Sequence, residues 1–253
     1  MLQRRIIFMG ILGILSTFAA LSAQGAEKSA KEILDYIDDL YRGESARGVM
    51  TMHIVTQHWE RTLKMHFSSQ GQNKSLVRIL EPAKEKGTAT LRVENDIWNY
   101  LPKTNRTIKL PSSMMSASWM GSHFTNDDLV KESRLTEDYT FEITDRRRQN
   151  GTQIIEITCH PKPEAAVVWG RVIQIVRTDG YQPLETHYLN EDLERVRTMI
   201  FSNIQQMDDR RIPLTLTVLP ENKPNEKTVV NYETVDYNVD LPPATFSLQA
   251  LKR

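Results

Sequence analysis

The chain has 253 residues, of which 32 are Lys or Arg, 32 are Asp or Glu, 40% are hydrophobic and one is Cys. A formal charge of zero argues against a protein that binds nucleic acid, because such proteins need a basic surplus to neutralise phosphates. An ordinary apolar fraction with both charge signs mixed excludes a disordered chain and favours a globular one.

Residues 1–26 have the layout of a signal peptide. Two arginines precede a mainly apolar run at 6–21, and small residues fill 22–26. The apolar run is short for a membrane span, which favours a cleavable signal over an uncleaved anchor. Cleavage near Ala23 or Ala26 leaves 30 basic and 32 acidic residues, a net charge of −2. We therefore expect a slightly acidic mature chain outside the cytoplasm.

The mature chain opens with a predicted amphipathic helix at 27–42. Its apolar residues recur at helical spacing with charged residues between them, and Gly43 is expected to end it. The apolar stripe consists of Ile33, Leu34, Ile37, Leu40 and Tyr41.

From Gly48 the apolar period changes to two, which is typical of strands with one buried face. Turn formers such as Asn150-Gly151 separate the runs. One continuous pattern favours a single antiparallel meander, forming a large curved sheet or barrel, so we expect one domain at 27–253. The predicted strands are 49–56, 59–67, 75–80, 89–93, 97–101, 106–110, 139–144, 153–158, 167–177, 184–189, 195–205, 214–219 and 228–237.

Two of these runs are apolar on both faces, at 167–176 and at 199–201. Strands buried on both sides need cover on both sides. We expect the 27–42 helix to cover one face of the sheet, while the other face lines an interior that is either filled or hollow.

The sole cysteine, Cys159, lies in an apolar alternating run, and no residues at metal-ligand or catalytic spacing accompany it. We expect a buried, inert side chain and no internal disulfide.

The stretch at 111–130 is the most unusual part of the chain. Its first half is rich in Met, Trp and Ser and nearly uncharged, and its second half reads as a helix start with Thr125 or Asn126 as cap. Asp127 and Asp128 are expected to serve the helix dipole rather than a metal. The apolar half either plugs the open end of the sheet or gates a ligand site, since Met-rich surfaces accept apolar partners of variable shape.

The run at 97–129 resembles the outer-membrane lipoprotein-sorting protein family, the LolA-like periplasmic proteins. The matching segments are Trp98-Asn99-Tyr100-Leu101-Pro102, Asn105-Arg106-Thr107, Leu110-Pro111, Trp119-Met120-Gly121-Ser122 and Phe124-Thr125-Asn126-Asp127-Asp128-Leu129, with Leu241-Pro242-Pro243 and Phe246-Ser247-Leu248 near the C-terminus.

The resemblance implies an α+β, β-rich fold: a LolA/LolB-like incomplete antiparallel β-barrel wrapped around a few helices. It also implies a hydrophobic cavity that accepts the acyl chains of a lipid or lipoprotein in the periplasm, without catalysis or cofactor. The partners implied are an inner-membrane transporter of the RND type or an outer-membrane receptor. We expect a monomer.

Candidate residues for lining or gating such a cavity are the apolar residues of the inward strand faces and of the unusual stretch. Ordinary core packing is the alternative for each of them, above all for Met65 and Phe67. The candidates are Met65, Phe67, Trp98, Tyr100, Leu110, Met114, Met115, Trp119, Met120 and Phe124.

Two other functions fit the sequence less well. A lipid-ester hydrolase could be assembled only from Ser122, His123 and Asp127, and no established hydrolase, metalloprotease, phosphate-loop or dithiol motif occurs. An accessory subunit could dock on an envelope transporter through the unusual stretch, with the basic run at 146–148 meeting anionic lipid, although a solvated hairpin explains that run equally well.

Overall fold

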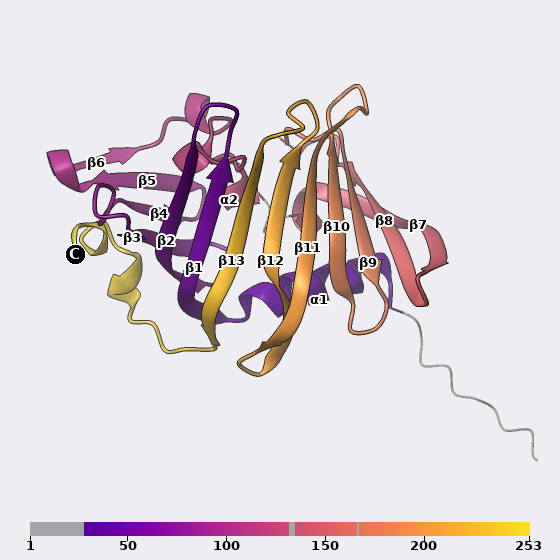
Figure 1. The fold of residues 1–253 in the computed structure, drawn as a ribbon. Coiled ribbons are helices and arrows are strands. Elements are labelled where there is room, and N and C mark those ends of the chain that lie inside the picture. The colour runs from indigo at the N-terminus through magenta and orange to yellow at the C-terminus, as the bar shows by residue number, and fades with distance from the viewer. Residues whose placement is uncertain (1–27, 132–134, 166) are drawn as a thin grey trace, which may run out of the picture.

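The computed structural model describes residues 28–131, 135–165 and 167–253, so the predicted signal peptide at 1–26 lies outside the described residues. Within these ranges thirteen strands form one antiparallel sheet, which curves strongly around an interior (Figure 1). The strands are β1 (Ser45–Val55), β2 (Glu60–Gln70), β3 (Lys74–Glu81), β4 (Ala89–Val93), β5 (Asp96–Leu101), β6 (Arg106–Lys109), β7 (Tyr139–Gln149), β8 (Thr152–Pro161), β9 (Arg171–Arg177), β10 (Gln182–Leu189), β11 (Arg195–Met207), β12 (Arg210–Pro220) and β13 (Lys227–Tyr237).

The strand order is β6-β5-β4-β3-β2-β1-β13-β12-β11-β10-β9-β8-β7. Two meanders, β1 to β6 and β7 to β13, are therefore joined where β1 pairs with β13, from Ala46 opposite Tyr237 to Val55 opposite Lys227. Because β6 and β7 are both edge strands, the sheet stays open. The prediction of an incomplete antiparallel barrel is confirmed, and each of the thirteen predicted strands has its counterpart.

Helix α1 (Ala30–Arg42) has Ser29 as its N-cap, and the Ser29 side chain forms a reciprocal capping box with Glu32. It ends at Gly43, which adopts a φ of 59° that few other residues tolerate. The predicted helix thus starts later than expected, at 30 rather than 27. The remaining helices are short: α2 (Asp128–Lys131), α3 (Leu135–Asp138) and the 3-10 turns η1 (Pro102–Thr104), η2 (Ser112–Met114), η3 (Trp119–Gly121), η5 (Pro243–Phe246) and η6 (Ala250–Lys252).

The core lies on the concave face of the sheet, and α1 packs there too. Ile33 and Leu34 of α1 join the same buried cluster as inward residues of the strands, such as Met52, Met65 and Met199. In Figure 1, α1 runs behind β11 and β12. The expectation that the helix covers one face while the other face lines the interior is therefore wrong, because helix and interior share one face.

The predicted strand at 167–177 is too long at its start. The β8–β9 ladder ends where Cys159 pairs with Val172, so β9 begins only at Arg171. Val168 lies before the strand and is exposed, whereas Trp169 packs on the core. Trp59 also precedes its strand, β2, and is exposed. In both places an alternating apolar pattern continues past the end of the strand.

Candidate functional site

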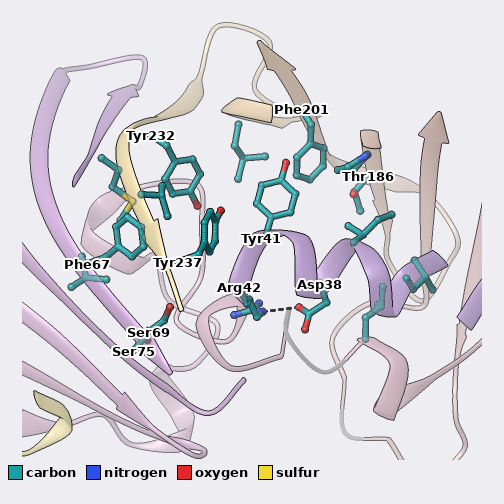
Figure 2. Close-up of a pocket in the computed structure, with 18 of the residues that line it drawn as sticks. Asp38, Tyr41, Arg42, Phe67, Ser69, Ser75, Thr186, Phe201, Tyr232 and Tyr237 are labelled. Atoms are coloured by element: carbon teal, nitrogen blue, oxygen red, sulfur yellow. Dashed lines mark hydrogen bonds and ion pairs between the residues drawn. The ribbon is translucent and has the colours of Figure 1, made fainter. Parts of the chain in front are cut away.

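A cavity of about 290 Å³ lies between α1 and the concave face of the sheet. Figure 2 shows α1 on one side of it and side chains from β2, β11 and β13 on the other. The lining residues are Leu34, Ile37, Asp38, Tyr41, Arg42, Met50, Phe67, Ser68, Ser69, Ser75, Val77, Leu135, Thr136, Gln174, Pro183, Thr186, Phe201, Leu216, Tyr232, Val235 and Tyr237.

The walls of the cavity are mostly apolar because they combine two periodic patterns. The helical stripe of α1 supplies Leu34, Ile37 and Tyr41, and inward residues of the strands supply most of the opposite wall. Aromatic pairs stiffen the walls. Phe67 meets Tyr232 edge to face with centroids 5.8 Å apart, and Tyr41 lies 6.0 Å from Phe201. Such pairs stabilise beyond the area they bury.

One end of the cavity is polar. The Arg42 Nε donates to Asp38 Oδ1 at 2.6 Å, one turn apart on α1. The exposed Gln72, in the β2–β3 turn, donates from Nε2 to Asp38 Oδ2 at 2.9 Å. Ser69 and Ser75 face each other across the β2–β3 ladder at the same end. The cavity is therefore amphipathic, with an apolar body and a polar end at the surface.

Of the ten candidates named from the sequence, Phe67 alone is among the lining residues of this cavity. Met65 is fully buried in the core beside it. Trp98 and Tyr100 belong to a separate cluster under the C-terminal turns, with Phe246 and Leu251. Whether any of the ten contacts a ligand stays a prediction.

The other six candidates lie in the stretch that runs from β6 to β7. Trp119 and Phe124 are buried in the main core, and Met120 packs against it. Leu110 and Met115 are half-buried, and Met114 is exposed.

The stretch from 111 to 131 is fixed to the sheet by long-range hydrogen bonds. Trp119 Nε1 donates to Thr90 Oγ1 in β4 at 3.2 Å, and the Arg61 guanidinium of β2 donates to the Met120 carbonyl. Both Nη groups of Arg197, in β11, hold the Asp128 carboxylate at 2.7 and 2.9 Å. These bonds reach three separate strands, β2, β4 and β11.

Thr125, one of the two residues expected to cap the helix, lies three residues before α2 begins and exchanges hydrogen bonds with its first residue, Asp128. Its Oγ1 accepts from the Asp128 backbone N–H, and Asp128 Oδ2 accepts from the Thr125 N–H. The Asn126 amide instead bridges the carbonyls of Met114 and Ala117. Asp128 therefore serves both the cap and the ion pair with Arg197.

The three residues of the hydrolase alternative do not form a triad. His123 contacts Thr228 Oγ1 through Nδ1 at 2.8 Å and Glu226 through Nε2 at 3.0 Å. The Ser122 hydroxyl donates to the Trp119 carbonyl at 2.7 Å and is buried. A serine nucleophile needs a hydrogen bond to its base, and here His123 is turned to other partners.

Sequence reasoning missed the polar end and most of the lining. Leu34, Ile37 and Tyr41 were recognised as a helix stripe, but nothing in the stripe shows that it borders an unfilled space. Arg42 and Ser69 come from segments that only the fold brings together. The one available signal was the position of Asp38 and Arg42 at i and i+4, beside the apolar stripe.

Among the described residues no group of three or more His, Cys, Asp or Glu side chains could hold a metal ion. The helices in the same ranges are all too short or too polar to cross a bilayer.

The open antiparallel sheet curved around α1 defines the LolA-like fold, and solved structures agree. A LolA superfamily protein from Nitrosomonas europaea superposes with a TM-score of 0.74 at 20% identity, covering 88% of this chain and 100% of that chain. A domain from Vibrio parahaemolyticus named for outer membrane lipoprotein sorting gives 0.75 at 22% identity, covering 88% and 97%. A DUF1329 family protein from Desulfovibrio piger gives 0.79 at 21% identity, covering 89% and 100%.

A family model described as "uncharacterized protein" matches residues 71–253, and the chain belongs to that family. No curated protein matches the sequence.

Proposed function

We propose that this protein is a non-enzymatic periplasmic carrier that binds an acyl chain of a lipid or lipoprotein in the cavity beside α1, for outer-membrane sorting or transport. Residues 27–253 act as one ligand-binding domain, and the signal at 1–26 directs export. The observation that carries the proposal is the cavity itself, with about 290 Å³ of space lined mainly by apolar side chains.

Burial of an acyl chain in the cavity supplies the binding free energy, and no catalytic step is needed. Each buried methylene contributes about 0.8 kcal/mol, so ten of them offer roughly 8 kcal/mol, the scale of micromolar affinity. The cavity volume is close to the lower limit of ligand pockets, which is about 300 Å³. This size favours a single acyl chain over a bundle of several.

The carrier must exchange its cargo with a membrane. An inner-membrane transporter of the RND type or an outer-membrane receptor would supply and receive it, as the resemblance to lipoprotein-sorting proteins implies. The likeness in fold to such proteins supports this placement, together with the signal-like sequence at 1–26.

The direct test is mass spectrometry of small molecules released from protein purified from its native periplasm without detergent. We expect stoichiometric acyl-chain compounds. A matched pair of variants separates the cavity from the outer surface. Leu216→Trp fills the cavity, whereas Thr217 lies on the opposite face of β12, so Thr217→Trp adds the same side chain outside.

The lipid should disappear from Leu216→Trp and persist in Thr217→Trp. Circular dichroism and the urea midpoint establish that both variants are folded. Equal lipid content in the wild type and a folded Leu216→Trp would refute binding in this cavity, and protein that carries no lipid at all would contradict the carrier role.

A further inference from the structure

The polar end of the cavity contains unused hydrogen-bond donors. Arg42 bonds Asp38 through Nε, and its two Nη groups have no hydrogen-bond partner among the residues that the structure describes. The side chain is 28% exposed and lines the cavity. A guanidinium can hold a carboxylate or phosphate through two parallel hydrogen bonds, and the two Nη groups remain available for this.

Two hydroxyls accompany the guanidinium. Ser69 of β2 and Ser75 of β3 are opposite each other in the ladder, and both line the cavity. Within the described ranges neither hydroxyl makes a hydrogen bond. Figure 2 shows Arg42 between Asp38 on one side and the two serines on the other. The β2–β3 turn between the two serines bonds through Gln72 to Asp38, the partner of Arg42, so these donors belong to the same end of the cavity.

Asp38 positions the guanidinium and leaves its far side free. One of its oxygens accepts from Arg42 Nε and the other accepts from Gln72 Nε2. Because both oxygens are engaged, the carboxylate is poorly placed to receive a cationic head group. The Arg42 Nη groups can only donate, and the two serine hydroxyls can donate or accept, so the guanidinium makes this end favour an anionic acceptor.

We propose that the polar end binds the oxyanion of a single-chain anionic amphiphile, whose alkyl chain occupies the apolar body of the cavity. Arg42 pairs with the oxyanion, and Ser69 and Ser75 donate to it. The oxyanion is a carboxylate, as in a fatty acid, or a phosphate monoester, as in a lysophospholipid. This inference rests on the proposed acyl-chain function and adds the chemistry of the head group.

The test uses amphiphiles that share a twelve-carbon chain and differ only in the head. Dodecanoate, dodecyl phosphate and dodecyltrimethylammonium are titrated into the delipidated mature chain by calorimetry, below their micelle concentrations. We expect at least one of the two anions to bind roughly tenfold or more tighter than the cation, the range for hydrogen bonds to a charged group. The anion that binds more tightly shows whether the natural head group is a carboxylate or a phosphate monoester.

Variants assign the preference to residues. Arg42→Gln should remove the preference for anions, while the alkyl chains of all three amphiphiles still bind in the cavity. The double variant Asp38→Asn/Arg42→Gln should give the same result and avoids leaving Asp38 without its cation. Lys31→Gln is the matched control, because Lys31 pairs with Asp35 on the exposed side of the same helix and does not line the cavity. The double variant Ser69→Ala/Ser75→Ala should weaken the binding of both anions and leave the binding of the cation unchanged.

The outcomes separate the two proposals. Equal binding of all three amphiphiles, or an anion preference that survives in the folded double variant, would overturn the head-group site and leave the acyl-chain function intact. Failure of all three to bind the wild type would overturn the acyl-chain function itself, and the head-group site with it.

Discussion

Gly48 of β1 lies opposite Phe67 of β2, and the Phe67 ring occupies the space that a side chain at Gly48 would need. A Cβ at Gly48 would be 2.9 Å from the ring and 2.0 Å from the Thr234 carbonyl oxygen. Phe67 is a wall of the cavity. The position of this wall therefore depends on a glycine in the neighbouring strand.

We expect Gly48→Ala to destabilise the protein by about 1 to 3 kcal/mol, the cost of overpacking a filled site, because the backbone of β13 cannot move as a side chain can. Urea denaturation measures the free energy of unfolding. Thr51→Ala, on the outer face of the same strand, serves as control and should change it little. A Gly48→Ala variant as stable as the wild type would show that β1 and β13 separate easily.

Trp119 is a core residue, and its replacement should cost stability. It is 5% exposed, belongs to the main buried cluster and donates from Nε1 to Thr90. Trp119→Ala should lower the free energy of unfolding by about 3 to 5 kcal/mol. Met114→Ala is the control, because Met114 is exposed on the same stretch. Equal midpoints for the two variants in urea would contradict the structure here.

The sequence of this stretch is apolar and nearly uncharged, so it fits a plug and a gate equally well. Its partners, Thr90 and the core beneath, come from distant strands and are invisible in the local sequence.

The strands, in contrast, were predictable, because an apolar period of two indicates which face of each strand is buried. The same pattern does not indicate where the interior is left unfilled. The cavity exists because residues of α1 do not reach every inward residue of β1, β2 and β13, which is a matter of distance between elements. Arg42 and Ser75 are 33 positions apart in the chain, and no local pattern connects them.

The buried ion pair between Arg197 and Asp128 should be a large contributor to the anchoring of the 111–131 stretch. Their side chains are 5% and 6% exposed, and the Arg197 guanidinium also stacks 4.0 Å from the Tyr188 ring centroid. Asp128→Ala leaves a buried charge without its partner and should cost about 3 to 5 kcal/mol, measured by urea denaturation.

The control for this prediction is the exposed pair of Arg177 and Asp179. Asp179→Ala should cost less than about 1 kcal/mol, since solvent screens exposed pairs. Similar losses in the two variants would mean that Asp128 is not buried in solution.

Glu226 should make stability depend on pH in the acid range. Its hydrogen bond with His123, aided by the Gln57 backbone and Lys223, lowers its pKa from 4.5 to about 2. A carboxyl with a depressed pKa binds its proton less readily in the folded state. Its contribution to stability is therefore complete above pH 4.5 and is lost as the pH falls towards 2.

The check compares the wild type with Glu226→Gln in urea at several pH values between 5 and 2.5. The glutamine variant should show a smaller loss on acidification, since other carboxyls titrate alike in both proteins. Parallel curves for the two proteins would rule out the depressed pKa. Thr228 holds the other nitrogen of His123 in either variant, so a local change at the carboxyl is what the comparison isolates.

Cys159 should be unreactive in the folded protein, as expected from its apolar strand. It is a free thiol with no exposed surface, and burial raises its pKa to about 12. Because the thiolate is the nucleophile, both access and ionisation are suppressed at pH 8. Ellman's reagent should therefore modify the native protein far more slowly than the urea-unfolded chain, which should react in full. Rapid stoichiometric reaction without denaturant would show that β8 opens readily to solvent.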